Sequence, residues 1–215
     1  MKIECKHIRH FGPSILKAKI PDELVNKINN YVEDIIKSKE KSEQLNYGEG
    51  LVGDVTQEFF LDNEFIKSSG WLNFLGSCTK EYVLKSEGRT ISKFELLKTW
   101  VVRQYQNEFN PTHWHSGHIS GAGFLKIPKS FGESVQKKQN KDYHGGKLEL
   151  IHGSRAFLSN SSYRIIPEVG DFYFFPNYLM HTVYPFKNTN EERRSISFNA
   201  KIDEKTWDIF GGKEK

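Results

Sequence analysis

The chain has 215 residues, and 31 Lys or Arg against 27 Asp or Glu give it a formal net charge of +4. This mild and scattered excess argues against a nucleic-acid-binding protein, because such proteins concentrate basic side chains in a stripe or patch that replaces counterions. No apolar run approaches the roughly 18 residues of a membrane-spanning helix, the N-terminus lacks the apolar stretch of a signal peptide, and two cysteines make no disulfide framework, so we expect a cytoplasmic protein without a membrane partner.

The N-terminal part of the chain, residues 1–94, is predicted to be mainly helical. Residues 22–39 carry apolar side chains at the spacing of an amphipathic helix, with a proline before them where a helix tolerates one. A polar loop over residues 48–54 follows. A second helical pattern covers residues 65–85 and is interrupted or entered near Gly70. We expect these helices to support a sheet.

From about Glu95 the pattern changes to short segments rich in β-branched and aromatic residues, separated by glycine and proline. Closely spaced short strands indicate a sandwich or barrel, and helices followed by strands give an α+β order. We predict a single domain over residues 1–215, with a β core over residues 95–203. The polar segment 129–145 is either a long hairpin loop or a mobile lid over a site.

Three histidines are the candidate metal ligands. His113 and His115 are alternate residues, which point to the same side of an extended strand, and His181 follows a later apolar strand that a jelly roll would return beside the first. Three protein ligands leave open positions for a cosubstrate and oxygen, as in non-haem Fe(II) oxygenases. The usual triad includes a carboxylate, whereas His115 makes this one all-nitrogen. The alternative is that His113, His115 and His118 are surface histidines of a loop.

A candidate anion site lies in the last predicted strand. Alternation puts Arg193, Ser195, Ser197 and Asn199 on one face of that strand, which makes the face polar. A guanidinium binds a carboxylate in bidentate fashion, so Arg193 could hold an anionic cosubstrate while Ser197 adds a hydroxyl. The alternative is an exposed edge strand with surface arginines.

Three motifs, in order, resemble one enzyme family. The string HWHSGHISGAGFLKIP is similar to the His-x-His-x-Gly-x-x-Ser-Gly stretch of 2-oxoglutarate/Fe(II) oxygenases found in marine bacteria and phages, distant relatives of the prolyl hydroxylases. The segment GDFYFFPNYLMHTVYPF resembles their Gly-Asp, Phe-Pro and His-x-Val-x-Pro elements, and ERRSISFN resembles their terminal motif. The three motifs span residues 96–203, about half of the chain, and their joint spacing is far more specific than any one alone.

The resemblance implies a double-stranded β-helix, or jelly roll, with the N-terminal helices packed on the outside of its major sheet. It implies that His113, His115 and His181 bind Fe(II) and that Arg193 anchors 2-oxoglutarate. The implied activity is that of a dioxygenase, a hydroxylase that couples decarboxylation of 2-oxoglutarate to oxidation of a small-molecule or peptide substrate, with ascorbate as a reductant.

One position departs from the family pattern. Relatives often carry Tyr-Tyr in the strand after the His-x-His loop, whereas this chain has Gly123 and Phe124. If a tyrosine hydroxyl at the position of Phe124 contacts the cosubstrate carboxylate, Tyr105 or Ser197 has to replace it here.

Two other functions fit part of the pattern. A cupin-type metalloenzyme without 2-oxoglutarate also has His-x-His and a later Gly-Asp and Pro-x-x-x-x-His, here Gly170, Asp171, Pro176 and His181. Against it, no glutamate follows His115 at three or four residues, and Arg193 would have no role. A non-catalytic jelly-roll binding module predicts that iron and 2-oxoglutarate leave stability unchanged.

Two further questions stay open at this point. Glu149 and Asp171 are the carboxylates to consider if the metal centre includes one. The substrate and the oligomeric state cannot be derived from the sequence, because loops such as residues 129–145 determine selectivity in folds of this kind.

Overall fold

The computed structural model of the chain describes residues 4–8, 12–47, 53–132 and 144–203. Its helices are α1 (Asp22–Lys37), α2 (Lys39–Leu45), α3 (Asn63–Ser68) and α4 (Trp71–Glu87). The major sheet has seven strands in the order β1 (Cys5–Ile8), β2 (Ile15–Lys19), β9 (Asp171–Pro176), β6 (Ile119–Lys126), β11 (Arg193–Ile202), β4 (Phe94–Gln104) and β3 (Gln57–Phe60). The minor sheet has four, in the order β5 (Asn110–His113), β10 (Met180–Val183), β7 (Leu148–Ile151) and β8 (Ser162–Ile165).

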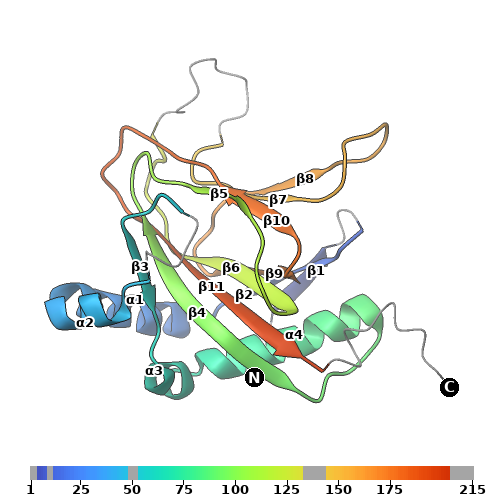
Figure 1. Cartoon of the computed structure of the whole chain (residues 1–215), viewed down its shortest axis with the longest axis horizontal. Helices are drawn as coiled ribbons and strands as arrows, with labels where there is room; N and C mark the ends of the chain where they lie inside the picture. Colours follow the sequence, from blue (N-terminus) through green and yellow to red (C-terminus); the bar gives the residue numbers. More distant parts are fainter. Residues whose placement is uncertain (1–3, 9–11, 48–52, 133–143, 204–215) are drawn as a thin grey trace.

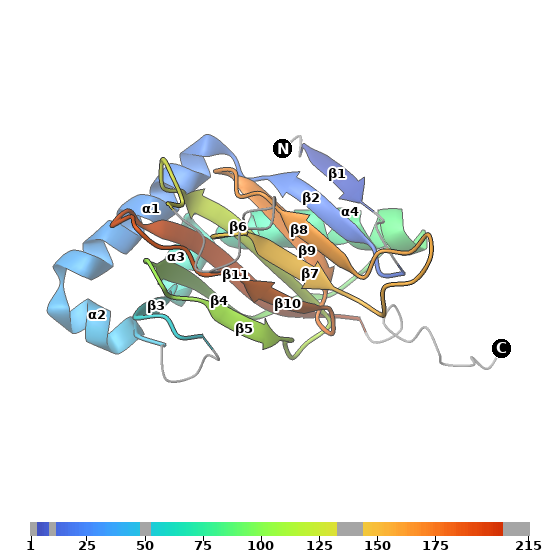
Figure 2. The ribbon, with the colours of Figure 1, turned by 90° about the horizontal axis from the view of Figure 1, so that it is seen from above.

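The described elements form three layers. In Figure 1 the minor sheet lies above the major sheet, and α1, α3 and α4 lie below it. Figure 2, seen from above, shows β5 and β10 crossing over β4 and β11. These layers have the predicted α+β arrangement, with the N-terminal helices on the outer face of the major sheet.

The helices begin and end where the local sequence favours it. The apolar stripe predicted for residues 22–39 becomes the buried face of α1. Asp62 caps α3, because its side chain accepts a hydrogen bond of 2.7 Å from the backbone N–H of Phe65. Gly70 has a φ of 92°, a left-handed conformation that favours glycine, and it separates α3 from α4. The predicted interruption near Gly70 is therefore confirmed.

The N-terminal part also contains three strands that the sequence pattern did not reveal. Strands β1 and β2 extend the major sheet beyond β9, and β3 forms its other edge beside β4. Strands of four or five residues repeat the period of two too few times to be recognised. Most of the predicted loop 48–54 and of the segment 129–145 lies outside the described residues, at 48–52 and 133–143.

Two apolar clusters lie on opposite faces of the major sheet. One joins the buried faces of α1 and α4 to Ile196 and Phe198 of β11. The other lies between the sheets and includes Phe124, Phe175 and Leu150. Side chains of β11 alternate between these faces, so its polar positions are directed into the space between the two sheets.

The glycines of β6 face the helical layer. A Cβ atom at Gly123 would lie 2.3 Å from the ring of Phe172, and one at Gly121 would lie 2.6 Å from the same ring. Only glycine allows Phe172 to pack this closely on the sheet. The departure from the family pattern at Gly123 therefore concerns core packing, whereas Phe124 faces the other way, between the sheets.

An ion network fixes the start of β11. Glu192 accepts hydrogen bonds of 2.7 Å from Nε of both Arg103 and Arg194, and Arg194 also donates to Glu33 of α1 at 2.6 Å. Burial would raise the pKa of Glu192, but the hydrogen bonds from Arg194 and Arg103 outweigh it and lower that pKa to about 2. The network ties β11 to β4 and to the helical layer.

Substituting the centre of this network should destabilise the fold. Glu192→Gln leaves the buried guanidinium of Arg103 without its carboxylate and that of Arg194 with Glu33 alone, which should cost about 3–5 kcal/mol of unfolding free energy. Urea unfolding of the native protein and of Glu192→Gln measures this difference in unfolding free energy. The control Glu95→Gln removes a solvent-exposed carboxylate paired with Lys93 and should barely move the midpoint. Equal midpoints for Glu192→Gln and the native protein would contradict the role of the network.

Candidate metal centre and its cavity

Strand pairing brings the three histidines together. His113 is the last residue of β5 and lies directly opposite His181 of β10 in an antiparallel pair. Residues paired in this way point to the same face of the sheet. His115 follows β5 by two residues, so the His-x-His spacing returns its side chain to the same side. The predicted triad is one cluster, whose ligand atoms all lie within 4.8 Å of one another.

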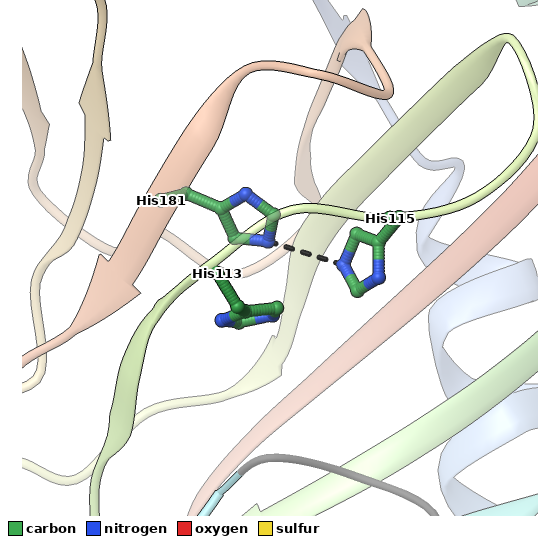
Figure 3. A group of neighbouring side chains, drawn as sticks. All are labelled: His113, His115 and His181. Carbon is green, nitrogen blue, oxygen red and sulfur yellow. Dashed lines mark hydrogen bonds between the residues drawn. The ribbon is translucent and has the colours of Figure 1, made fainter.

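The imidazole rings face a common point, as Figure 3 shows. The Nε2 atoms of His115 and His181 are 3.1 Å apart, and the ring centroids of His113 and His181 are 4.3 Å apart. Two ligands at right angles to each other on a metal with bonds of about 2.1 Å are separated by about 3 Å. The spacing of His115 and His181 therefore suits two neighbouring positions on one ion.

Backbone carbonyls orient two of the rings. Nδ1 of His113 lies 2.7 Å from the carbonyl oxygen of Pro111, and Nδ1 of His181 lies 3.0 Å from that of Leu179. A carbonyl can only accept, so each Nδ1 carries the hydrogen and donates it. The lone pair is then on Nε2, the atom that faces the cluster. Such contacts are the usual support of metal-binding histidines.

The loop that carries His115 is held by the turn between β9 and β10. The backbone N–H of His115 donates to the carbonyl of Asn177 at 3.0 Å, and the Asn177 amide donates back to the carbonyl of His115 at 2.9 Å. The edge of the His115 ring meets Trp100 of β4, with centroids 5.5 Å apart. His118 has a structural role, since its Nδ1 accepts a hydrogen bond of 3.0 Å from the N–H of Ile202.

Burial keeps the cluster neutral. It lowers the pKa of His115 to about 2 and that of His181 to about 3, with a further contribution from the neighbouring imidazoles, and it also lowers the pKa of His113. Neutral imidazole is the form that binds metal ions, and it suits Fe, Zn, Cu and Ni. The alternative that His113, His115 and His118 are surface histidines of a loop does not fit His113 and His115, whose pKa values are lowered mainly by burial.

Arg193 is buried in the same cavity. Only 2% of its surface is exposed, and its guanidinium donates to the carbonyl of Gly146 at 2.9 Å and to the hydroxyl of Ser195 at 3.2 Å. The ring of Phe124 lies 5.1 Å from its central carbon. Desolvation lowers the pKa of Arg193 to about 9. Within the described part of the chain, no carboxylate forms an ion pair with this side chain.

The cavity between the sheets contains most of the predicted site residues. It is lined by His113, His115, His181, Arg193, Ser195, Ser197, Glu58, Trp100, Val102, Asn110, Leu148, Val183, Ala122, Gly53 and Gly121. Tyr105 is not among these residues, because its hydroxyl lies against the guanidinium of Arg103. Ser195, which contacts Arg193, and Ser197 both line the cavity, and the predicted use of Tyr105 is not supported by its position.

The two carboxylates considered from sequence are bound elsewhere. Glu149 accepts a hydrogen bond of 2.9 Å from Arg164, and Asp171 pairs with Lys17 at 2.6 Å. Among the described residues, the cluster of possible metal ligands contains the three histidines and no carboxylate.

Sequence reasoning missed one acidic residue of the cavity. Glu58 lies on β3, is 1% exposed, and its buried Oε1 atom has no hydrogen-bond partner among the described residues. Burial, followed by the charge of Glu108, raises the pKa of Glu58 to about 8. In a four-residue strand, no pattern distinguished this glutamate from a solvent-exposed one.

Comparison with protein families supplies an independent result. Residues 98–199 match the model of a family described as "Putative 2OG-Fe(II) oxygenase". This range contains the three histidines and Arg193. A search of curated proteins finds no match to the sequence.

Solved structures share the fold at low sequence identity. A prolyl-4-hydroxylase from Pseudomonas putida has a TM-score of 0.55 and 14% identity, with 91% of each chain covered. The viral collagen prolyl hydroxylase of Paramecium Bursaria Chlorella virus-1, solved with 2OG, has a TM-score of 0.52 and 14% identity over 86% of this chain and 94% of the other. The α-ketoglutarate-dependent epimerase SnoN of nogalamycin biosynthesis has a TM-score of 0.53 and 15% identity, covering 85% and 76%. The predicted double-stranded β-helix is thus confirmed.

Metal binding should depend on the histidine cluster. Manganese(II) at 100 times its dissociation constant should stabilise the native protein by about 2.7 kcal/mol, and His181→Ala should lose that gain. Thermal unfolding with and without the ion measures it. His152→Ala, a histidine outside the cluster, should keep the native response; the same loss in both variants would contradict the assignment.

The buried acid should make stability fall as the pH rises. The pKa of Glu58 is about 8 in the folded chain and 4.5 in the reference state, so folding favours the protonated form and stability is lost between these values. Relative to Glu58→Gln, the native protein should lose up to about 4 kcal/mol of unfolding free energy over this range. Urea midpoints of both proteins near pH 5 and near pH 8 test it; parallel changes would contradict the buried, unpaired carboxyl.

Proposed function

Since residues 98–199 match the model of a family described as "Putative 2OG-Fe(II) oxygenase", we propose that the chain belongs to this family and that its cavity is the active site of a hydroxylase. Enzymes of this family use Fe(II) and 2-oxoglutarate. In the proposed site His113, His115 and His181 hold the iron, and Arg193 binds the distal carboxylate of 2-oxoglutarate. A single oxygenase domain over residues 1–215 belongs to the same proposal, because strands of residues 1–94 complete the major sheet.

The observation that carries this proposal is a buried guanidinium in the cavity of the histidine cluster. Among the residues that the structure describes, Arg193 has neutral hydrogen-bond partners only, a carbonyl and a hydroxyl. A buried charge without an opposite charge is costly, and a bidentate carboxylate is the ligand that compensates a guanidinium best. A dicarboxylate that reaches from the metal to Arg193 satisfies both ends of the cavity at once.

The three imidazoles fit iron by number and by protonation state. They are neutral, their Nε2 atoms converge, and three protein ligands leave coordination positions for a chelating cosubstrate and oxygen. When bound, the iron supplies the oxygen chemistry that couples decarboxylation of 2-oxoglutarate to oxidation of the substrate.

The remaining side chains of the cavity orient the cosubstrate and exclude water. Ser195 accepts a hydrogen bond from Arg193, so in the proposed site its hydroxyl hydrogen can be donated to the anion that Arg193 holds. Phe124 occupies the position where relatives often carry tyrosine, and it offers a ring face to the guanidinium. Leu148 and Val183 close the cavity from the minor sheet and keep it apolar there. Ser195 and Ser197 therefore supply hydroxyl groups in place of the tyrosine hydroxyl of relatives.

The substrate class follows from the relatives only in outline. The structural neighbours include prolyl hydroxylases and an epimerase, so we propose a small-molecule or peptide substrate and no nucleic acid. We also propose a cytoplasmic location, since Cys5 and Cys78 are free thiols, which suits a reducing compartment, and ascorbate as a reductant of the iron. No helix of the described part is long and apolar enough to cross a membrane.

Turnover of 2-oxoglutarate tests the proposal. With Fe(II) and air, the native protein should form succinate, and His181→Ala should form none. Arg193→Ala should raise the KM for 2-oxoglutarate by about 10- to 100-fold, because a charge-assisted pair contributes about 1.5–3 kcal/mol. Arg193→Lys keeps the charge and loses the bidentate geometry, so its KM for 2-oxoglutarate should lie between those of the native protein and Arg193→Ala.

Two controls separate binding from folding. Arg155→Ala, on an exposed loop, should keep the native KM. Calorimetry with Mn(II) in place of iron measures binding of 2-oxoglutarate without turnover. The affinity should fall from the native protein to Arg193→Lys and then to Arg193→Ala. A native protein that neither decarboxylates nor binds 2-oxoglutarate would instead favour a cupin-type enzyme or a binding module.

A further inference from the structure

Glu58 is directed into the cavity by the register of the major sheet. It pairs with Val102 of β4, and Val102 pairs with Ser195 of β11. Residues paired across neighbouring strands share a face, so Glu58 lies on the cavity side, in one row with Ser195. Figure 2 shows β3 at the edge of the major sheet, beside β4. Glu58 thus lines the cavity from its edge.

Glu58 differs from the other buried acids of the described residues. Glu149 is bound by Arg164, Asp171 by Lys17, and Glu192 by two arginines. Glu58 has no ion pair among the described residues, although it is the least exposed of the four. A buried carboxyl without a partner stabilises nothing in the free protein.

The cosubstrate does not explain this carboxyl. Glu58 is two strands away from Ser195, a separation of about 10 Å between backbones, and so lies away from the guanidinium of Arg193. Glu58 therefore lines the cavity at a distance from Ser195, and Trp100 lines the same cavity.

The chemistry of this region favours a cation. A desolvated carboxyl gains most from a donor that carries positive charge, because a charge-assisted hydrogen bond is about twice as strong as a neutral one. The indole of Trp100, which lines the same cavity, already has the ammonium of Lys98 5.8 Å from its ring centroid, so the attraction for a further cation comes from Glu58. Burial holds the carboxyl in its neutral form at neutral pH, with a pKa of about 8, until such a charge arrives.

We propose that Glu58 binds a protonated amino group of the substrate and so makes the enzyme selective for amines. The inference rests on the proposed function, since it identifies the substrate class of that same site. On binding, the ammonium donates to the carboxylate, and the proton that Glu58 carried in the free protein is released to solvent. Substrate and cosubstrate then occupy opposite ends of the cavity, one on Glu58 and the other on Arg193.

Calorimetry with two matched probes tests this proposal. The protein, loaded with Mn(II) and 2-oxoglutarate, is titrated with n-butylammonium and with its neutral isostere n-butanol. The native protein should bind the ammonium more tightly, and Glu58→Gln should weaken that binding by about 10- to 100-fold while leaving n-butanol unchanged. Glu95→Gln is the matched control on an exposed carboxylate.

Proton release provides a second readout. Repeating the titration near pH 7 in two buffers of different ionisation enthalpy should show about one proton released by the native protein and none by Glu58→Gln or Glu58→Met. Equal binding of both probes by the native protein, no binding of the ammonium, or an unchanged affinity in Glu58→Gln would overturn the proposal.

Failure of the proposed function would be seen separately. Glu58→Gln should keep the native affinity for 2-oxoglutarate, and the amine titration can be run with Mn(II) alone. A protein that binds n-butylammonium through Glu58 but does not bind 2-oxoglutarate would refute the oxygenase proposal alone. A protein that binds 2-oxoglutarate without any preference for the ammonium would refute only the role of Glu58.

Discussion

The site depends on the register between β5 and β10. His113 and His181 come from distant parts of the chain, and they meet because they lie opposite each other in an antiparallel pair. A shift of one residue would turn one of the two rings to the other face of the minor sheet, since side chains alternate along a strand. His115 depends on the same pair, because its loop is bound to Asn177, just before β10.

Two buried groups of opposite character line one cavity, from strands β11 and β3, which β4 separates. Within the part of the chain that the structure describes, Arg193 has neutral partners only and Glu58 has an oxygen with none, whereas Glu192 and Glu149 both form ion pairs. Burial disfavours the charged form of both, lowering the pKa of Arg193 to about 9 and raising that of Glu58 to about 8. In the free protein, the burial of these two groups costs free energy that ligands bound to Arg193 and Glu58 can offset. A cupin-type enzyme without 2-oxoglutarate would leave Arg193 without such a ligand.

Sequence patterns predicted those parts of the site that short-range geometry determines. Alternation gives the shared direction of His113 and His115, and it gives the polar face of β11 that carries Arg193 and Ser197. The pairing of His181 with His113 depends on tertiary contacts, and it was supplied by the resemblance to a family. The position of Tyr105 and the role of Glu58 could not be predicted, because the ion network around Arg103 and the four-residue strand β3 have no periodic pattern.

Anomalous diffraction from crystals soaked with Mn(II) and 2-oxoglutarate is the most direct test of the central claim. One manganese peak should lie within bonding distance of Nε2 of His113, His115 and His181, with no protein carboxylate bound to it. The distal carboxylate of 2-oxoglutarate should pair with the guanidinium of Arg193. A peak away from the three rings, a protein carboxylate on the metal, or a cosubstrate turned away from Arg193 would contradict it.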